Sequence, residues 1–393
     1  MQLSVDCGMP ISPKVPPCAF LKSSSDGLPN SFRLPHGDTP DWKRARRKFR
    51  IANFVTYSGS PGIWGPATTN ATLLAASEIN RRGGFLGREI EVVLCEAGGA
   101  IEDVARRARD AVEFDEVDLV MGSHISAVRL ALRKAIGGRV PYIYTPVYEG
   151  GERTPGVLAI GETPRSHSRA AIHWLADAKR ASRWYLIGSD YVWPWLSHRA
   201  LKTYIAETGG HVIGEEFVPL GVDNHDVHLA RIRAAKPDVV MISLIGADSI
   251  AFNRSFGEAG LGRSILRLAG AMDETVLLGI GPENSENLFC ASGYFNCIQS
   301  AENDAFQDRY RAAFGASSPP VGSVGESNYE GLHFLEAAVR QAGSSSSRAL
   351  LAAGSNIIYS SVRGPVSVRK GRASMPIFLA ESDGIDFKIV HRF

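Results

Sequence analysis

The sequence predicts an α/β protein of two lobes, in which each lobe is a mainly parallel sheet flanked by helices. The chain has 393 residues, which is long for one domain and natural for two α/β lobes. From residue 50, short β-branched runs alternate with longer amphipathic stretches, as in a parallel sheet with crossover helices. The alternation restarts near residue 184, which favours two similar lobes over one large sheet.

The predicted elements follow one another in three groups. The first group has a helix that Gly83 and Gly84 end, and its strands and helices cover residues 51–56, 66–81, 89–94, 101–113, 117–121, 126–135 and 141–145. The second group covers 184–187, 195–207, 212–218, 227–234, 239–245 and 265–268. After residue 290 we expect a long helix at 326–341, a Ser-rich turn at 344–347, and antiparallel strands at 365–368, 377–380 and 387–390.

These groups define the expected lobes. Residues 50–165 and 298–345 form the first lobe, and residues 166–297 and 346–393 form the second, with a ligand cleft between them. The composition suits this division, because 44% hydrophobic and 21% charged residues predict a sizeable core. The formal charge of +2 gives no reason to expect a nucleic-acid partner. No run of about 18 apolar residues occurs, so no membrane-spanning helix is expected.

The start of the chain predicts a disordered extension over residues 1–49, which are rich in Pro, Ser and Asp. They lack the apolar core of a secretory signal. Arg46 and Arg47 resemble a twin-arginine export signal, but the apolar stretch that follows is short and reads better as a strand. An odd count of five cysteines also favours a reducing compartment. We therefore expect a cytoplasmic location, with a periplasmic one as the alternative, and expect Cys95, Cys290 and Cys297 to be small buried residues.

Motifs of enzymes are missing from this sequence. It contains no P-loop, no Gly-x-Ser-x-Gly elbow, no His-Glu-x-x-His and no paired cysteine motif. His124 and His167 are isolated histidines, which are more often packed or surface residues than catalytic ones. We expect no enzyme activity, no catalytic residue, no bound metal and no cofactor.

Several segments match a known family in order and spacing. They are Phe54–Gly59, Ala75–Gly84, Met121–Ser126, Thr145–Gly150 and Gly188–Pro194. This chain resembles the amide- and urea-binding branch of the branched-chain amino-acid binding-protein family, over roughly residues 50–393. The resemblance implies a type I periplasmic-binding-protein fold with the ligand held between the lobes, where strand ends and helix N-termini meet.

The resemblance also implies a set of ligand-binding residues. They are His124, Ser126, Tyr144, Thr145 and Pro146 from the first lobe, and Tyr191 and Trp193 from the second. Ser126 would offer its hydroxyl and a helix-N-terminal amide to a ligand carbonyl, and the aromatic rings would form walls. This chain departs from the amide sensors at His124 and Trp193, where they have tyrosine, and at Val147, which is an extra residue.

Other interpretations of the same residues stay open. Tyr144 could be a strand core residue, Tyr191 and Trp193 could be interface packing, and Ser126 could be a plain N-cap. Glu149, Asp190 and Glu274 are acidic residues near the expected cleft, and an acidic residue could recognise the ammonium group of an amino acid.

By resemblance, the chain would be a sensor of short aliphatic amides that regulates amidase expression through an RNA-binding antitermination protein. The alternative is the substrate-binding component of an ABC transporter, which delivers amides, urea or amino acids to a permease. In both cases the partner at the cleft is a small molecule, and we expect a homo-oligomer.

Overall fold

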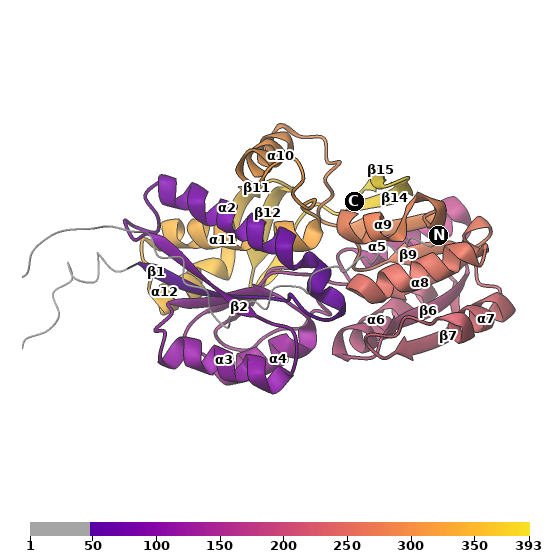
Figure 1. The fold of residues 1–393 in the computed structure, drawn as a ribbon, viewed down its shortest axis with the longest axis horizontal. Coiled ribbons are helices and arrows are strands. Elements are labelled where there is room, and N and C mark those ends of the chain that lie inside the picture. The colour runs from indigo at the N-terminus through magenta and orange to yellow at the C-terminus, as the bar shows by residue number, and fades with distance from the viewer. Residues whose placement is uncertain (1–47) are drawn as a thin grey trace, which may run out of the picture.

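The computed structural model describes residues 48–393, which form two lobes, each built around its own sheet (Figure 1). The predicted two-lobed α/β fold is confirmed. The arginine pair at 46–47 and all but two residues of the predicted extension lie outside the described residues. Phe49, which the prediction placed in that extension, already belongs to the first strand.

The first lobe has a parallel sheet of five strands in the order β2-β1-β3-β4-β5. Its strand β1 is buried along almost its whole length, as expected for a strand covered on both faces. The strands are β1 (Phe49–Val55), β2 (Ile90–Glu96), β3 (Leu119–Ser123), β4 (Tyr142–Tyr144) and β5 (Val157–Ala159).

Helices cover both faces of this sheet. Side chains of α3 and α4 pack against Ala52 and Phe54 on one face, whereas α2 and α11 pack against Ile51 and Met121 on the other. The α4 helix ends at Gly137, whose φ of 60° gives the left-handed C-cap that glycine allows. The helical elements of this lobe are η1 (Ser60–Trp64), α2 (Gly65–Arg81), α3 (Ile101–Glu113), α4 (Ser126–Ile136), α10 (Ala301–Phe314), α11 (Ser323–Ala342) and α12 (Ser347–Gly354).

A small antiparallel sheet belongs to the first lobe, which differs from the predicted division. It consists of β11 (Asn356–Ser361), β12 (Gly364–Arg369) and β13 (Arg372–Ser374). Residues 346–374 were expected in the second lobe, but α12 and β11 pack against α11. The reason is burial: Ile357 and Val368 share one apolar cluster with Leu335 and Val339 of α11. The prediction of antiparallel pairing at the end of the chain is confirmed.

The second lobe has a seven-stranded sheet in the order β15-β14-β10-β9-β8-β6-β7, in which β14 alone runs opposite to the other strands. Its strands are β6 (Arg183–Ser189), β7 (His211–Val218), β8 (Val239–Ser243), β9 (Leu266–Ala269), β10 (Leu288–Ser292), β14 (Phe378–Asp383) and β15 (Asp386–Arg392). Its helical elements are α5 (Ser168–Lys179), α6 (Val192–Glu207), α7 (Asp226–Ala235), α8 (Gly246–Glu258), η2 (Leu261–Arg263), α9 (Glu274–Ile280) and η3 (Pro282–Asn284).

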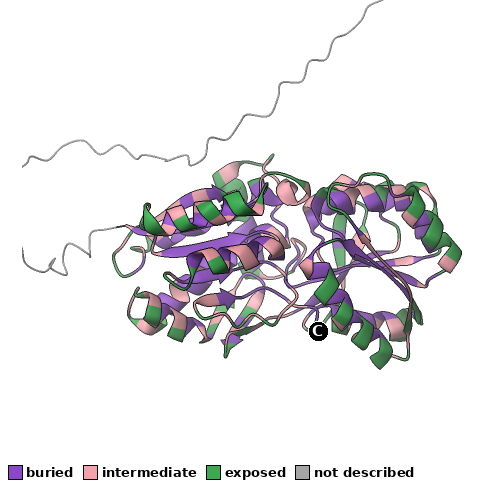
Figure 2. Ribbon diagram, turned by 90° about the horizontal axis from the view of Figure 1, so that it is seen from below, coloured by how far each residue is buried: buried purple, intermediate pink, exposed green. Residues whose placement is uncertain are grey.

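Burial follows this layering. The strands of both sheets and the inward faces of the helices are buried, whereas the outward helix faces are exposed (Figure 2). Cys95 and Cys290 are buried as expected, but Cys297 is only half-buried. Within residues 48–393, no helix combines the length and the apolar character that crossing a membrane requires.

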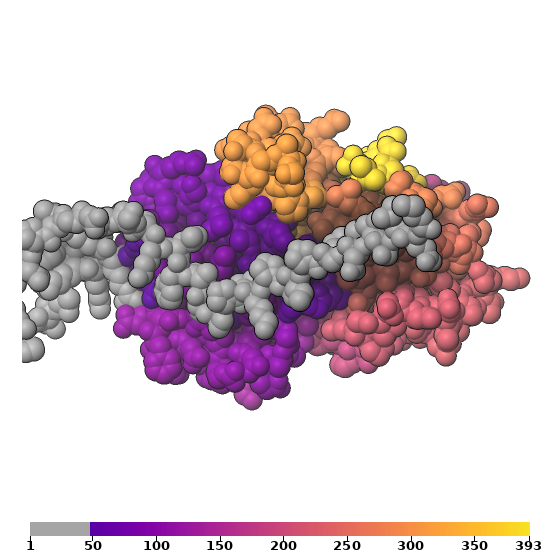
Figure 3. All heavy atoms as spheres, viewed as in Figure 1, coloured from indigo at the N-terminus to yellow at the C-terminus, as the bar shows by residue number. Residues whose placement is uncertain are grey.

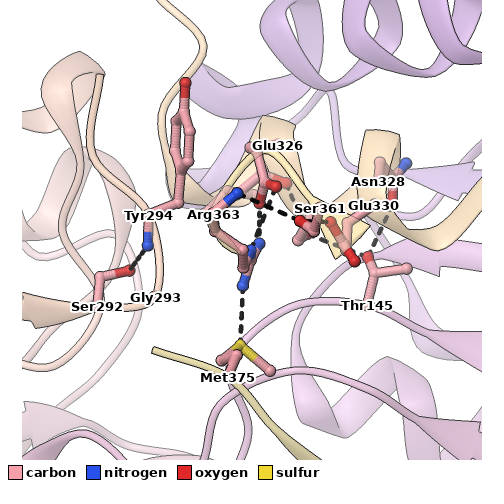
Figure 4. Close-up of polar contacts among 12 residues, drawn as sticks. Thr145, Ser292, Gly293, Tyr294, Glu326, Asn328, Glu330, Ser361, Arg363 and Met375 are labelled. Atoms are coloured by element: carbon pink, nitrogen blue, oxygen red, sulfur yellow. Dashed lines mark hydrogen bonds and ion pairs between the residues drawn. The ribbon is translucent and has the colours of Figure 1, made fainter. Parts of the chain in front are cut away.

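Three segments connect the lobes: residues 160–167, 293–300 and 375–377. One buried guanidinium binds two of them directly and reaches the other through a shared carboxylate. The Nη1 atom of Arg363 lies 3.0 Å from Oε1 of Glu162 in the first segment. The same atom lies 3.0 Å from Sδ of Met375 in the third segment (Figure 4). The same Glu162 oxygen accepts a hydrogen bond of 2.9 Å from the amide of Gly293 in the second segment. We call these contacts the hinge cluster.

The hinge cluster is anchored in the first lobe by α11. Glu326 accepts hydrogen bonds from Nε of Arg363 at 3.2 Å and from its Nη2. The side chains of Arg363, Glu162 and Glu326 are at most 6% exposed. Burial lowers the pKa of Arg363 because it penalises the charged form, and two carboxylates oppose that penalty. Each charge here therefore depends on the others for compensation.

We predict that Arg363→Met strongly destabilises the fold. Methionine fills similar space but leaves two buried carboxylates without a cation, which costs about 3–5 kcal/mol. Urea unfolding measures this loss. The matched control is Arg340→Met, because Arg340 pairs with Glu336 at 3.4 Å but is 76% exposed, so its removal should change little. Equal stabilities of the two variants would contradict the assigned role.

Candidate functional site

A cavity lies between the lobes, at the carboxyl ends of β1, β3 and β4 and the N-termini of α2, α4 and α6. Its volume is about 50 Å³, where a single water needs roughly 10–15 Å³ on the same scale. We call it the main cavity. From the first lobe it is lined by Val55, Thr56, Pro61, Trp64, Gly65, Thr68, Ser123, His124, Ile125, Ser126, Tyr144, Pro146, Val147 and Val324. From the second lobe it is lined by Tyr191, Trp193, Ile245 and Ala271.

Six of the seven predicted site residues meet in this cavity. They are His124, Ser126, Tyr144, Pro146, Tyr191 and Trp193. The seventh, Thr145, lies outside the lining: its hydroxyl donates a hydrogen bond of 2.8 Å to Oδ1 of Asn328 in α11. Successive side chains of an extended segment point to opposite faces. Since Tyr144 faces the cavity, Thr145 faces the core.

Ser126 is the first residue of α4 and does not cap it. Its hydroxyl donates a hydrogen bond of 2.6 Å to Oε2 of Glu149. Glu149 in turn binds Arg129, and both side chains are at most 3% exposed. The Ser126 oxygen can therefore only accept a hydrogen bond from a ligand, while the first amides of α4 have no acceptor inside the helix.

The hydroxyl hydrogen of Tyr144 is also donated to another residue of the protein. Its hydroxyl donates a hydrogen bond of 2.6 Å to the carbonyl of His124, so it also presents lone pairs to the cavity. The His124 ring contacts the hydroxyl of Tyr142 through Nε2 at 3.0 Å. Burial lowers the pKa of His124 to about 3, so this ring is neutral at pH 7. Among the described residues that line the cavity, no side chain is an aspartate, glutamate, lysine or arginine.

The second lobe contributes two aromatic walls. The rings of Tyr191 and Trp193 lie 6.3 Å apart at 35° to each other. Within residues 48–393 the indole Nε1 of Trp193 is buried without a hydrogen-bond partner. It is a donor only, so it suits a ligand oxygen. A buried donor without a partner is costly, which makes this indole a candidate to bind a ligand.

Three hydroxyl residues of the lining were missed in the sequence. The hydroxyls of Thr56, Thr68 and Ser123 are buried and have no hydrogen-bond partner in the described part of the chain. Each can both donate and accept. Thr56 and Ser123 stand at the ends of parallel strands, and Thr68 lies in the first turn of α2. Position at a strand end was a sequence signal that could have identified Thr56 and Ser123.

The acidic alternatives do not reach the main cavity. Glu149 is engaged by Ser126 and Arg129, and Asp190 accepts a hydrogen bond of 3.0 Å from Nε1 of Trp195. Glu274 accepts one of 2.6 Å from the amide of Asn296. Burial, with a smaller contribution from Asp273, raises the pKa of Glu274 to about 8. None of the three carboxylates lines the main cavity.

The lobes are closed over the cavity: η1 contacts α8 and α4 contacts α6, and in the lower half of Figure 3 the purple spheres of the first lobe adjoin the pink spheres of the second. The α8 helix has no capping side chain of its own lobe. Instead Ser60 of η1, from the first lobe, donates to the carbonyl of Ile245 at 2.6 Å and accepts from the amide of Asp248 at 3.0 Å. Trp64 donates across the cleft to Asp273 at 2.9 Å.

Glycine at position 246 permits this contact. A Cβ on Gly246 would lie 2.0 Å from the carbonyl oxygen of Ser60, far inside van der Waals contact. Its φ is also positive, at 52°. At the other end of the same helix, Gly260 has a φ of 69°, but a Cβ added there would meet nothing within 4 Å. Only the first of these two glycines therefore bears on closure.

We predict that Gly246→Ala shifts the protein towards an open form. The added methyl group would collide with Ser60 only when the lobes are closed, so small-angle X-ray scattering should show a larger radius of gyration. Gly260→Ala is the control, because it carries the same cost of about 1–2 kcal/mol for a left-handed residue without the collision. If both variants scatter like the parent, Gly246 does not limit closure.

Known proteins share this two-lobed fold. A family model described as periplasmic binding protein matches residues 48–386. A solute-binding protein of an R. palustris ABC transporter, in complex with 4-hydroxybenzoate, has a TM-score of 0.77 at 17% identity, covering 88% of this chain and 97% of that one.

Two further solved structures are similar. A solute-binding protein from Rhodopseudomonas palustris BisB5, in complex with 3,4-dihydroxybenzoic acid, has a TM-score of 0.76 at 22% identity, with coverages of 89% and 97%. A leucine-binding protein from Thermotoga maritima MSB8 has a TM-score of 0.76 at 17% identity, with coverages of 88% and 98%. The two-lobed fold, the cleft and the matched family model agree, and this chain belongs to the periplasmic binding protein family.

Proposed function

We propose that the chain is a receptor for a small solute whose uncharged primary-amide or urea head group is bound in the main cavity. The observation that carries this proposal is the direction of two hydrogen bonds. The hydroxyls of Ser126 and Tyr144 donate to Glu149 and to the carbonyl of His124. Both therefore face the ligand as acceptors, and the ligand must supply N–H or O–H donors.

A primary amide supplies these donors and also an acceptor. Its NH₂ group can donate to Ser126 and Tyr144, while its carbonyl can accept from the first amides of α4 or from Nε1 of Trp193. A carboxylate would place lone pairs against the lone pairs of Ser126, close to the Glu149 carboxylate. Burying it without a cation in the lining would add a desolvation cost. The cavity volume of about 50 Å³ suits only a few heavy atoms.

For the biological role we propose delivery of this solute to an ABC permease. Support comes from the similar solved structures, which include solute-binding proteins of ABC transporters. The regulatory role, with an RNA-binding partner protein, rests on the motif resemblance at residues 121–126, 145–150 and 188–194. The pocket chemistry suits both roles, so they differ in location and partner.

We predict that propanamide stabilises the protein against heat and that propanoate does not. The two compounds have nearly the same shape, so charge and donor capacity are what distinguish them. A ligand at 100 times its dissociation constant adds about 2.7 kcal/mol of stability, which a thermal-shift measurement detects. Stabilisation by propanoate but not by propanamide would overturn the proposal.

Variants of the lining tie this response to the main cavity. Ser126→Ala and Tyr144→Phe should each weaken propanamide binding by about 1 kcal/mol, from a lost buried hydrogen bond, as measured by calorimetry. Ser197→Ala is the matched control: Ser197 is buried as well, and its hydroxyl has no hydrogen-bond partner among residues 48–393, but it lies outside the lining. Unchanged affinity in both lining variants would place the ligand elsewhere.

A reporter fusion separates the two roles. A transport receptor must reach the far side of the membrane, so export of a reporter enzyme fused after residues 1–60 would support the delivery role. A version with Arg46→Lys and Arg47→Lys tests whether the arginine pair is read as an export signal. Retention of the reporter in the cytoplasm would favour the regulatory role.

A further inference from the structure

A second, smaller cavity adjoins the main one on the side of the lobe connections. Its volume is about 20 Å³, enough for one small polar group. The two cavities share four lining residues: Pro146, Val147, Ala271 and Val324. We call it the hinge-side cavity, because Glu162 of the first connecting segment lines it. Val147, the extra residue of this chain, thus stands in the wall between the two cavities.

The hinge cluster, which lies beside this cavity, carries more negative than positive charge. Oε1 of Glu162 accepts from Arg363 and from the amide of Gly293, whereas Oε2 makes no hydrogen bond to a described residue. The single guanidinium of Arg363 faces two carboxylates, because Glu326 binds it as well. Burial raises the pKa of the nearby Glu330, which favours its neutral form. One negative charge of the cluster therefore has no cation within it, and a buried charge of this kind requires a partner.

Two further acceptors line the hinge-side cavity. His167 is 2% exposed, and its Nε2 is buried without a hydrogen-bond partner in the described residues. Burial lowers the pKa of His167 to about 4, so the ring is neutral at pH 7. When Nδ1 donates to Ser168, 3.0 Å away, Nε2 offers a lone pair. The Ser292 hydroxyl also lines the cavity and receives only a long contact of 3.4 Å from the amide of Tyr294.

We propose that the hinge-side cavity is a subsite for a cationic nitrogen at the far end of the ligand. An ammonium group has three donors and no acceptor, which matches Oε2 of Glu162, Nε2 of His167 and the hydroxyl of Ser292. Its charge would compensate the excess carboxylate of the hinge cluster. This inference rests on the proposed function: the amide head occupies the main cavity, and a short chain passes the wall at Val147. The ligand class is then an amide with a terminal amine.

The test compares three ligands of nearly equal shape on the unmodified protein. They are butanamide, 3-hydroxypropanamide and 3-aminopropanamide, which end in a methyl, a hydroxyl and an ammonium group. We expect calorimetry to show at least tenfold tighter binding of 3-aminopropanamide than of butanamide, with the hydroxyl compound between them. Charge-assisted hydrogen bonds are roughly twice as strong as neutral ones, which supports this order.

Glu162→Gln removes the charge but keeps an oxygen that can accept from Gly293 and Arg363. In this variant the preference for the amine should disappear while butanamide affinity stays within about threefold. Glu326→Gln is the control, because it neutralises the other carboxylate of the hinge cluster and lines neither cavity. It should weaken the preference for the amine without abolishing it, because it removes the excess charge of the hinge cluster but leaves the Glu162 carboxylate to bind the ammonium directly.

The outcomes separate the two proposals. Binding of butanamide without a preference for the amine overturns the subsite and leaves the amide receptor intact. Loss of the preference in both variants also overturns the subsite, because the effect would then belong to the hinge cluster as a whole. If neither butanamide nor 3-aminopropanamide binds, the proposed function fails and the subsite fails with it.

Discussion

The guanidinium of Arg363 is the contact on which the relation between the two lobes depends. It binds Glu162 and Met375 directly and reaches Gly293 through Glu162, so all three connections meet at one charged group. Glu326 fixes that group to α11 of the first lobe. A pair of lobes joined by three separate segments could twist in several ways. Because the segments are bound near one point, we expect the lobes to open by rotation about that point.

The opposite side of the cleft is held by weaker contacts. Ser60 of η1 makes two hydrogen bonds at the N-terminus of α8, and Trp64 makes one at the N-terminus of α9. Pro61 and Trp64 also line the main cavity, as does Ile245, so a ligand and the cross-cleft contacts share the same residues. A ligand that touches both lobes favours the closed form by its difference in affinity for the two forms. The buried contacts of Arg363 thus set the axis of rotation between the lobes. The hydrogen bonds of Ser60 and Trp64 across the cleft are weaker and leave closure reversible.

The sequence was sufficient for the fold because β-branched runs and amphipathic stretches differ in period, and this difference survives without knowledge of contacts. It was less informative where the outcome depends on tertiary packing. The strand signal at 365–368 predicts a strand but cannot tell which lobe offers Val368 an apolar surface. Arg363 gives no signal either, since an isolated arginine between two short strands usually lies on the surface.

The residues of the candidate site were likewise only partly predictable from the sequence. Motif resemblance identified Ser126, Tyr191 and Trp193, which line the main cavity, and also Thr145, which does not. Which of two neighbours faces a cavity is decided by the register of the strand, and one residue of shift exchanges them. Thr56, Thr68 and Ser123 escaped notice because a hydroxyl in an apolar segment is common. Only the absence of a partner, which requires coordinates, makes them informative.

The capping of α8 by Ser60 has a consequence for how ligand occupancy could be observed. When the lobes separate, the first turn of α8 loses the capping hydroxyl of Ser60, and an uncapped helix end frays. The backbone amide of Asp248 would then exchange its hydrogen with solvent faster, although it lies beyond the ligand's reach. In this protein the local stability of one helix end therefore reports whether the cleft is occupied.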